Sequence, residues 1–117
     1  MIRQLTFPYL ACLIAALLVT LWTFDRLLKL EYETYYAEWV QDGRPDGIFS
    51  HFSGSSWFKG SFARNWLSFR WLFVTPEWMK SSPQAMKLII RLRISASIWN
   101  LGILVALVVT FAFPSAW

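Results

Sequence analysis

Two long stretches without a charged side chain constrain this chain more than any other feature. Residues 5–24 and residues 94–117 contain no Asp, Glu, Lys, Arg or His. At a helical rise of about 1.5 Å per residue, each stretch is long enough to cross a hydrocarbon core of about 30 Å. We therefore predict an all-α membrane protein with transmembrane helices at residues 5–24 and 94–117.

The first stretch has an alternative interpretation as a cleaved signal sequence, because Arg3 supplies a minimal positive region in front of it. However, its 20 residues exceed the usual apolar core of a signal sequence, which has about 7–15 residues. Trp22, Thr23 and Phe24 at its end also offer no cleavage site of small residues. A retained anchor is the better interpretation.

The composition agrees with a membrane protein and excludes several other classes. Of the 117 residues, 56% are hydrophobic and only 15% are charged, against about 25% charged in an ordinary soluble domain. The single cysteine cannot form an internal disulfide, and one cysteine with one histidine falls short of the ligand set of a usual zinc site. We expect no metal and no cofactor.

The orientation follows from the distribution of positive charge. The chain has 11 Lys and Arg residues, and all but Arg3 lie in residues 25–93. Several of them crowd the inner ends of the two stretches: Arg26, Lys29, Lys87, Arg91 and Arg93. Because basic residues beside a span resist translocation, we predict a two-span helical hairpin in the plasma (inner) membrane, with residues 25–93 cytoplasmic and both termini outside.

The cytoplasmic segment divides into an acidic and a basic part. Residues 25–47 hold six acidic and three basic side chains, whereas residues 48–93 hold one acidic and seven basic ones. Helical spacing, including Asp25 four residues before Lys29, predicts an acidic helix over residues 25–41 that continues the first span. Glycine and proline then predict a loop over residues 42–60, and we expect basic, aromatic helices over residues 61–93.

One predicted helix in the basic part carries an aromatic face with helical spacing. Its members are Phe62, Trp66, Phe69 and Phe73. Arg70 lies beside this face, and Arg64 and Ser68 are expected elsewhere on the surface. Alternating basic and aromatic residues are typical of helices in lipid headgroups, of protein contacts and of single-stranded nucleic acid binding. Attachment to the membrane at both ends favours membrane-surface or partner contact and argues against nucleic acid.

The second span has two faces suited to helix packing. Small residues at Gly102 and Ala106 predict close contact with the first span. On the other side, about 200° around the helix from Gly102, Asn100 predicts contact with another chain. This second face also contains Ala96, Ser97 and Leu104. The alternative for Asn100 is that its carboxamide reaches the headgroup water.

The sequence offers little catalytic chemistry. It has no glycine-rich phosphate loop, no nucleophile elbow and no paired metal-binding histidines. His51, between Ser50 and Phe52, matches no nucleophile motif and is expected to be a loop histidine packed by phenylalanines. Cys12, near the middle of the first span, is expected to be a small packing residue. We predict that the protein is not an enzyme, and the charge-free spans argue against a pore.

Four short segments resemble a known family. Asp42-Gly43, Phe49-Ser50-His51, the stretch from Trp66 to Trp71 and Arg91-Leu92-Arg93 are similar to features of the universal stress protein B family of small bacterial inner-membrane proteins. The Thr75-Pro76-Glu77-Trp78 segment departs from that family. The resemblance implies a two-span protein of a bacterial inner membrane and adds no catalytic residue.

Two functions remain at this stage. We expect a non-catalytic accessory or stabilising subunit of a larger inner-membrane complex, with other integral membrane subunits and lipid headgroups as its partners. The alternative is a free-standing stress-response or lipid-interacting membrane protein that acts through its basic aromatic cytoplasmic surface. No small-molecule substrate is expected in either case.

Overall fold

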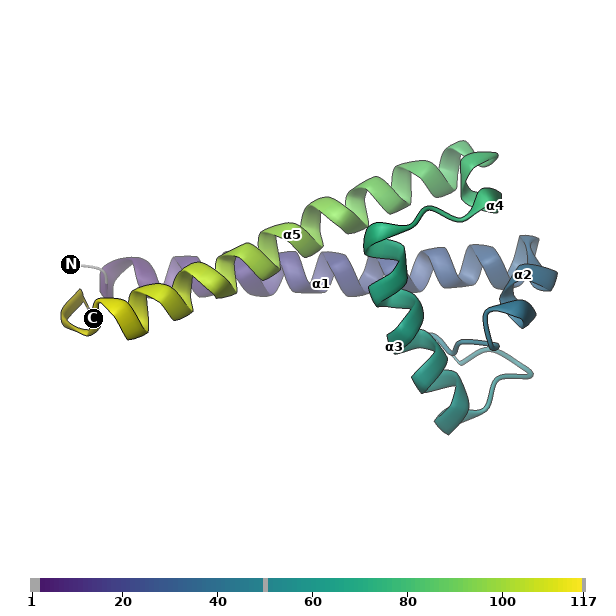
Figure 1. Ribbon diagram of the computed structural model, residues 1–117, viewed down its shortest axis with the longest axis horizontal. Coiled ribbons are helices and arrows are strands. Elements are labelled where there is room, and N and C mark those ends of the chain that lie inside the picture. Colours follow the sequence, from purple (N-terminus) through teal and green to yellow (C-terminus); the bar gives the residue numbers. More distant parts are fainter. Residues whose placement is uncertain (1–2, 50, 117) are drawn as a thin grey trace.

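The computed structural model describes residues 3–49 and 51–116, and within these residues the chain is helical without any strand (Figure 1). The helices are α1 (Arg3–Thr34), α2 (Tyr36–Gln41), α3 (Trp57–Phe73), α4 (Glu77–Lys80) and α5 (Pro83–Ala112), followed by a short 3-10 turn at Pro114–Ala116. The predicted all-α class is confirmed. Helices α1 and α5 are each long and apolar enough to cross a membrane.

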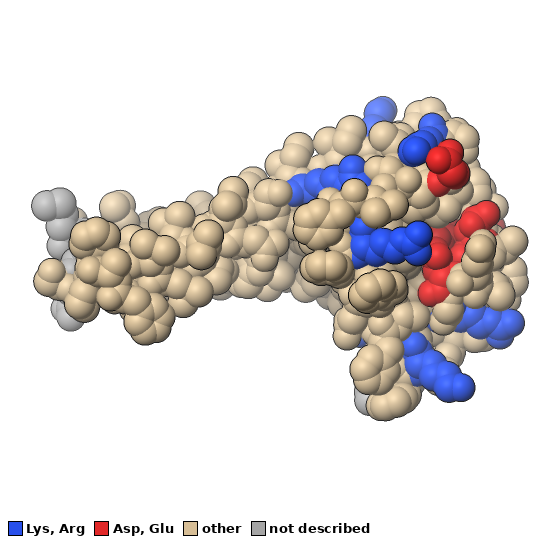
Figure 2. All heavy atoms as spheres, viewed as in Figure 1, with Lys and Arg blue, Asp and Glu red and all other residues tan. Residues whose placement is uncertain are grey.

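Helices α1 and α5 lie side by side in opposite directions, so that the start of α1 and the end of α5 lie at the same end of the molecule (Figure 1). The molecule measures 54 × 31 × 20 Å. We call residues 3–24 and 94–112 the rod and residues 25–93 the head. On the face drawn in Figure 2, the charged side chains gather on the head and the rod is covered by uncharged atoms.

The two helices of the rod contact each other through small and polar side chains. The Tyr9 hydroxyl donates a hydrogen bond to the carbonyl of Gly102, and the hydroxyl oxygens of Thr20 and Ser95 lie 2.9 Å apart. Gly102 allows this approach because a Cβ atom there would meet the Leu13 side chain at 2.2 Å. The rod is therefore a closely packed helix pair.

The head has its own hydrophobic core, built on the inner ends of α1 and α5. Its buried members are Phe24, Leu27, Leu28, Trp39, Phe52, Leu67, Trp71, Trp78, Met79, Ala85, Leu88, Ile89 and Leu92. They come from all five helices and from the loop before α3. Burial of this much apolar surface makes the head a small packed domain at one end of the rod.

Three boundaries differ from those expected. The loop expected over residues 42–60 is shorter, because α3 begins at Trp57 and includes Gly60, whose missing side chain leaves room for Ser55. The acidic helix expected over residues 25–41 is interrupted at Tyr35. The α-helix that begins at Pro83 ends at Ala112, before the end of the apolar stretch, because proline at position 114 disfavours a helical conformation in the residue before it.

Candidate membrane-interface site

Helix α3 lies crosswise to α1 and α5, where the rod meets the head (Figure 1). The four aromatic side chains with helical spacing, which we call the aromatic stripe, are all exposed: Phe62 by 63%, Trp66 by 67%, Phe69 by 59% and Phe73 by 72%. The Phe69 ring lies 6.5 Å from the ring of Trp66 and 5.3 Å from that of Phe73, measured between centroids. The stripe is therefore an apolar surface that the chain itself does not cover.

The opposite side of α3 is part of the core of the head. Leu67 and Trp71 are buried, and the Trp71 ring lies 5.3 Å from the ring of Phe24 and 6.1 Å from that of Trp78. Trp71 follows Trp66 by five residues, which turns it about 140° around the helix from the stripe. The helical spacing alone thus separates the two tryptophans onto opposite faces.

Arg93 fixes the C-terminal end of α3 to α5. Its Nε donates to the carbonyl of Trp71 at 3.1 Å, and its Nη2 donates to the Thr75 hydroxyl at 2.7 Å. We expected Arg93 only as one of the positive charges beside the second span. These contacts between residues about 20 positions apart have no signature in the local sequence pattern.

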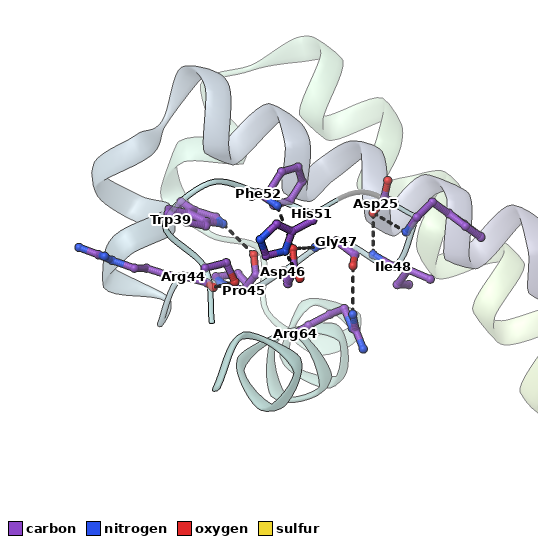
Figure 3. Close-up of polar contacts among 12 residues, drawn as sticks. Asp25, Trp39, Arg44, Pro45, Asp46, Gly47, Ile48, His51, Phe52 and Arg64 are labelled. Atoms are coloured by element: carbon purple, nitrogen blue, oxygen red, sulfur yellow. Dashed lines mark hydrogen bonds and ion pairs between the residues drawn. The ribbon is translucent and has the colours of Figure 1, made fainter. Parts of the chain in front are cut away.

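The loop before α3 is fixed to α1 by Asp25 (Figure 3). This buried carboxylate accepts hydrogen bonds from the backbone N–H groups of Ile48 at 2.8 Å and Phe49 at 3.3 Å. Lys29, one turn further along α1, lies 4.0 Å from Glu33 on an exposed surface. Asp25 therefore positions the loop. The exposed ion pair of Lys29 and Glu33 adds little to the stability of the fold.

A second buried carboxylate, Asp46, organises the loop itself (Figure 3). Its Oδ1 accepts from the backbone N–H groups of Gly47 at 3.0 Å and Phe52 at 2.9 Å, and its Oδ2 lies 2.8 Å from Nδ1 of His51. Burial would raise the pKa of Asp46, but the hydrogen bonds from His51 and the two backbone groups outweigh it and hold the pKa below its usual range. Asp46 is thus a charged anchor of the loop at neutral pH.

The expected packing of His51 between phenylalanines is wrong in part. Phe52 is buried, but Phe49 and the His51 ring are exposed, and His51 is held by Asp46. Cys12 also differs from expectation, because it lies on an exposed surface of α1 and does not pack inside the chain. Asp46 itself was missed because an Asp-Gly pair is most often an ordinary turn.

A groove of about 480 Å³ lies where α1, α3 and α5 meet. Its apolar walls include Leu21, Leu72 and Trp99, and its polar lining includes Arg64 and Asn100. Arg64, expected on the surface away from the stripe, is half-buried in this groove, and its Nη1 donates to the carbonyl of Gly47 at 3.1 Å. Ser68, expected on the surface as well, also lines the groove.

The face of α5 expected to contact another chain is divided in the structure. Ala96 is buried by this chain and lines the groove, so it is not available to a partner helix as expected. Ser97, Asn100 and Leu104 are exposed, and the Asn100 carboxamide donates to the carbonyl of Ala96 at 2.7 Å. On the other face, Gly102 contacts α1, and Ala106 is half-buried.

Glu31 is a fully buried carboxyl group in the head, beyond the charge-free stretch at residues 5–24. Among the described residues, none meets hydrogen-bond geometry with either of its carboxyl oxygens. Burial, followed by the nearby carboxyl groups of Asp42 and Glu38, raises the pKa of Glu31 to about 10. Glu31 is therefore protonated at neutral pH and belongs to the core as a neutral group.

Comparisons with family models, curated proteins and solved structures give no match. The similarity to the universal stress protein B family stays a prediction.

Proposed function

We propose that this chain is a non-enzymatic membrane protein that crosses the bilayer twice as a helical hairpin and acts at the cytoplasmic headgroup layer of a plasma membrane. The observation that carries the proposal is the exposed aromatic stripe on α3, a helix crosswise to the rod at the level where the charge-free part of each helix ends. If the rod spans the membrane, α3 lies parallel to the membrane surface.

The charges around the stripe support this placement. Lys59 and Arg70 are exposed and lie about 60–80° around α3 from Phe62, beside the rings. An interfacial helix places its rings at the acyl boundary, and its basic side chains reach lipid phosphates. Each ring that becomes fully buried contributes about 1.5–3 kcal/mol. The stripe is therefore large enough to hold α3 at a bilayer surface.

The depth of the stripe is measurable with spin labels in lipid bilayers. In a Cys12→Ser background, a label at Trp66→Cys should be accessible to oxygen and protected from an aqueous nickel reagent. A label at Lys80→Cys, on an exposed position of α4, provides the control and should show the reverse. Equal nickel access at both positions would reject the proposal that α3 lies in the interface.

The orientation is tested separately in intact cells. A thiol reagent confined to the exterior should label a cysteine at Ser115→Cys and leave one at Ser55→Cys unlabelled, because the positive charge of the head predicts a cytoplasmic location. Labelling at position 55 and protection at position 115 would show that the topology is the reverse of the one proposed.

A second candidate function is that of an accessory subunit in a larger membrane complex. It is favoured by the exposure of Ser97, Asn100 and Leu104 along one side of α5. Extraction in a mild detergent followed by size measurement separates the two functions. Migration with a large assembly supports the subunit, and a small particle of this chain with lipid supports the first proposal.

A further inference from the structure

We propose that the groove between α3 and the rod binds one phospholipid, with an acyl chain along its apolar walls and the phosphate at Arg64. The inference rests on the proposed function, because it requires the rod to span a bilayer. It goes further by assigning a lipid-binding site of defined chemistry to a groove that shares only Phe69 with the stripe.

The level of the groove matches that of a phospholipid at the membrane boundary. Leu21 and Trp99 belong to the charge-free parts of α1 and α5, and Arg64 lies on α3 beside the loop of the head. The groove therefore passes from apolar walls at the end of the rod to a cation at the head. A phospholipid has the same order of groups, from acyl chain to phosphate.

Arg64 has hydrogen-bonding capacity for a phosphate. It is half-buried, and within the described part of the chain no carboxylate forms an ion pair with it. One guanidinium nitrogen donates to the carbonyl of Gly47, and a guanidinium has five N–H groups in total. The remaining donors suit the oxygens of a phosphate, which arginine binds with fixed geometry. The amide groups of Asn65 and Asn100 also line the groove.

The size and lining of the groove favour a lipid over a partner helix. Its volume of about 480 Å³ lies within the range of about 300–1,000 Å³ typical of small-molecule sites. One turn of an α-helix with side chains, about 11 Å across and 5.4 Å high, already occupies roughly 500 Å³. Phe24, Leu72 and Leu92 supply apolar contact that a free phosphate ion would not use.

The surroundings of Arg64 predict which headgroup binds better. Beyond Arg64 lies a second hollow lined by Ser61, His51 and Asp46. Among the described residues that line this hollow, Asp46 is the one with a carboxylate. It already accepts hydrogen bonds from Gly47, Phe52 and His51. Because Asp46 is also buried, a choline ammonium would find no exposed carboxylate there. We expect phosphatidylglycerol to bind in preference to phosphatidylcholine.

Native mass spectrometry of the full chain in mild detergent tests the site. With added phosphatidylglycerol, the unmodified protein should retain one lipid, and Arg64→Gln should weaken retention about tenfold, the loss of one charge-assisted contact. Arg44→Gln is the matched control, because it removes the same charge from an exposed position in the loop before α3, outside the groove lining, and it should retain lipid normally. Arg64→Lys should recover part of the binding.

A second pair of variants keeps the test decisive if Arg64→Gln unfolds the loop. Ser68→Phe fills the groove and should exclude the lipid, whereas Ser97→Phe adds the same ring on an exposed surface outside the groove lining and should not. Equal retention by both members of each pair would overturn the proposal. Full displacement of the lipid by inorganic phosphate would identify an ion site instead. The spin labels test whether α3 lies in the membrane interface, and lipid retention tests whether the groove binds a lipid. The failure of one proposal is therefore distinguished from the failure of the other.

Discussion

The rod and the head use the same kinds of apolar side chain in opposite ways. In the rod, one side of α1 packs against one side of α5, and we call this contact the seam. The remaining surface of both helices is exposed, with Phe7 exposed by 83% and Phe111 by 80%. In the head, Trp39 is 0% and Trp71 1% exposed. The head covers its own apolar surface, whereas the rod leaves its surface to a surrounding medium. Stability of the isolated chain should therefore depend mainly on the head.

The largest effect should come from removing a core aromatic of the head. Trp71→Ala should lower the free energy of unfolding by about 3–5 kcal/mol, because it leaves a large cavity. Trp66→Ala, the same change on the same helix, should cost less than about 1 kcal/mol in detergent because the ring is exposed. Thermal unfolding followed by circular dichroism compares the two. Equal losses would mean that the stripe also packs inside the folded chain.

The next largest effect concerns the buried carboxyl group of Glu31. It tests whether the core of the head tolerates a charged side chain. The raised pKa of this carboxyl means that folding favours its protonated form, so stability should fall as pH rises from 4.5 towards about 10. The slope should be about 1 kcal/mol per pH unit. Glu31→Gln should remove this slope and stabilise the head at pH 8. Exposed Glu77→Gln is the control and should leave the slope intact.

A smaller effect is expected in the seam of the rod. Gly102→Leu should cost about 1–3 kcal/mol, because the added side chain meets Leu13 and displaces α1. Val105→Leu, on an exposed position of α5, should be close to neutral. Unfolding midpoints in one detergent measure both changes. A neutral Gly102→Leu would show that the seam is not closely packed.

The smallest effect should come from Asn100→Leu, at less than about 1 kcal/mol. The carboxamide already donates to the carbonyl of Ala96 within its own helix, and hydrogen bonds between membrane helices average about 0.6 kcal/mol. Val105→Leu, on an exposed position about 140° around α5 from Asn100, serves as the control. Loss of a large assembly on Asn100→Leu, but not on Val105→Leu, would favour the accessory-subunit function and would show that the rod has a protein partner.

Patterns along the chain predicted the features that depend on neighbouring residues. Two charge-free stretches indicated the long helices, and helical spacing indicated the stripe. The same patterns missed what joins distant segments, such as Asp25 bonding residues 48 and 49, or the half-buried position of Arg64. Ala96 was misplaced for a related reason, because the groove that it lines exists only once α1, α3 and α5 pack together.

The hydrogen bonds of Asp25 and Arg93 have a mechanical consequence for the molecule. Asp25 attaches the segment before α3 to one long helix, and Arg93 attaches the end of α3 to the other. Arg64 joins the middle of α3 to Gly47, next to the segment that Asp25 holds. A helix held at two points cannot rotate independently of the two long helices. When the bilayer becomes thinner or thicker, the hairpin should therefore tilt as one rigid body, and α3 should keep its angle to the rod.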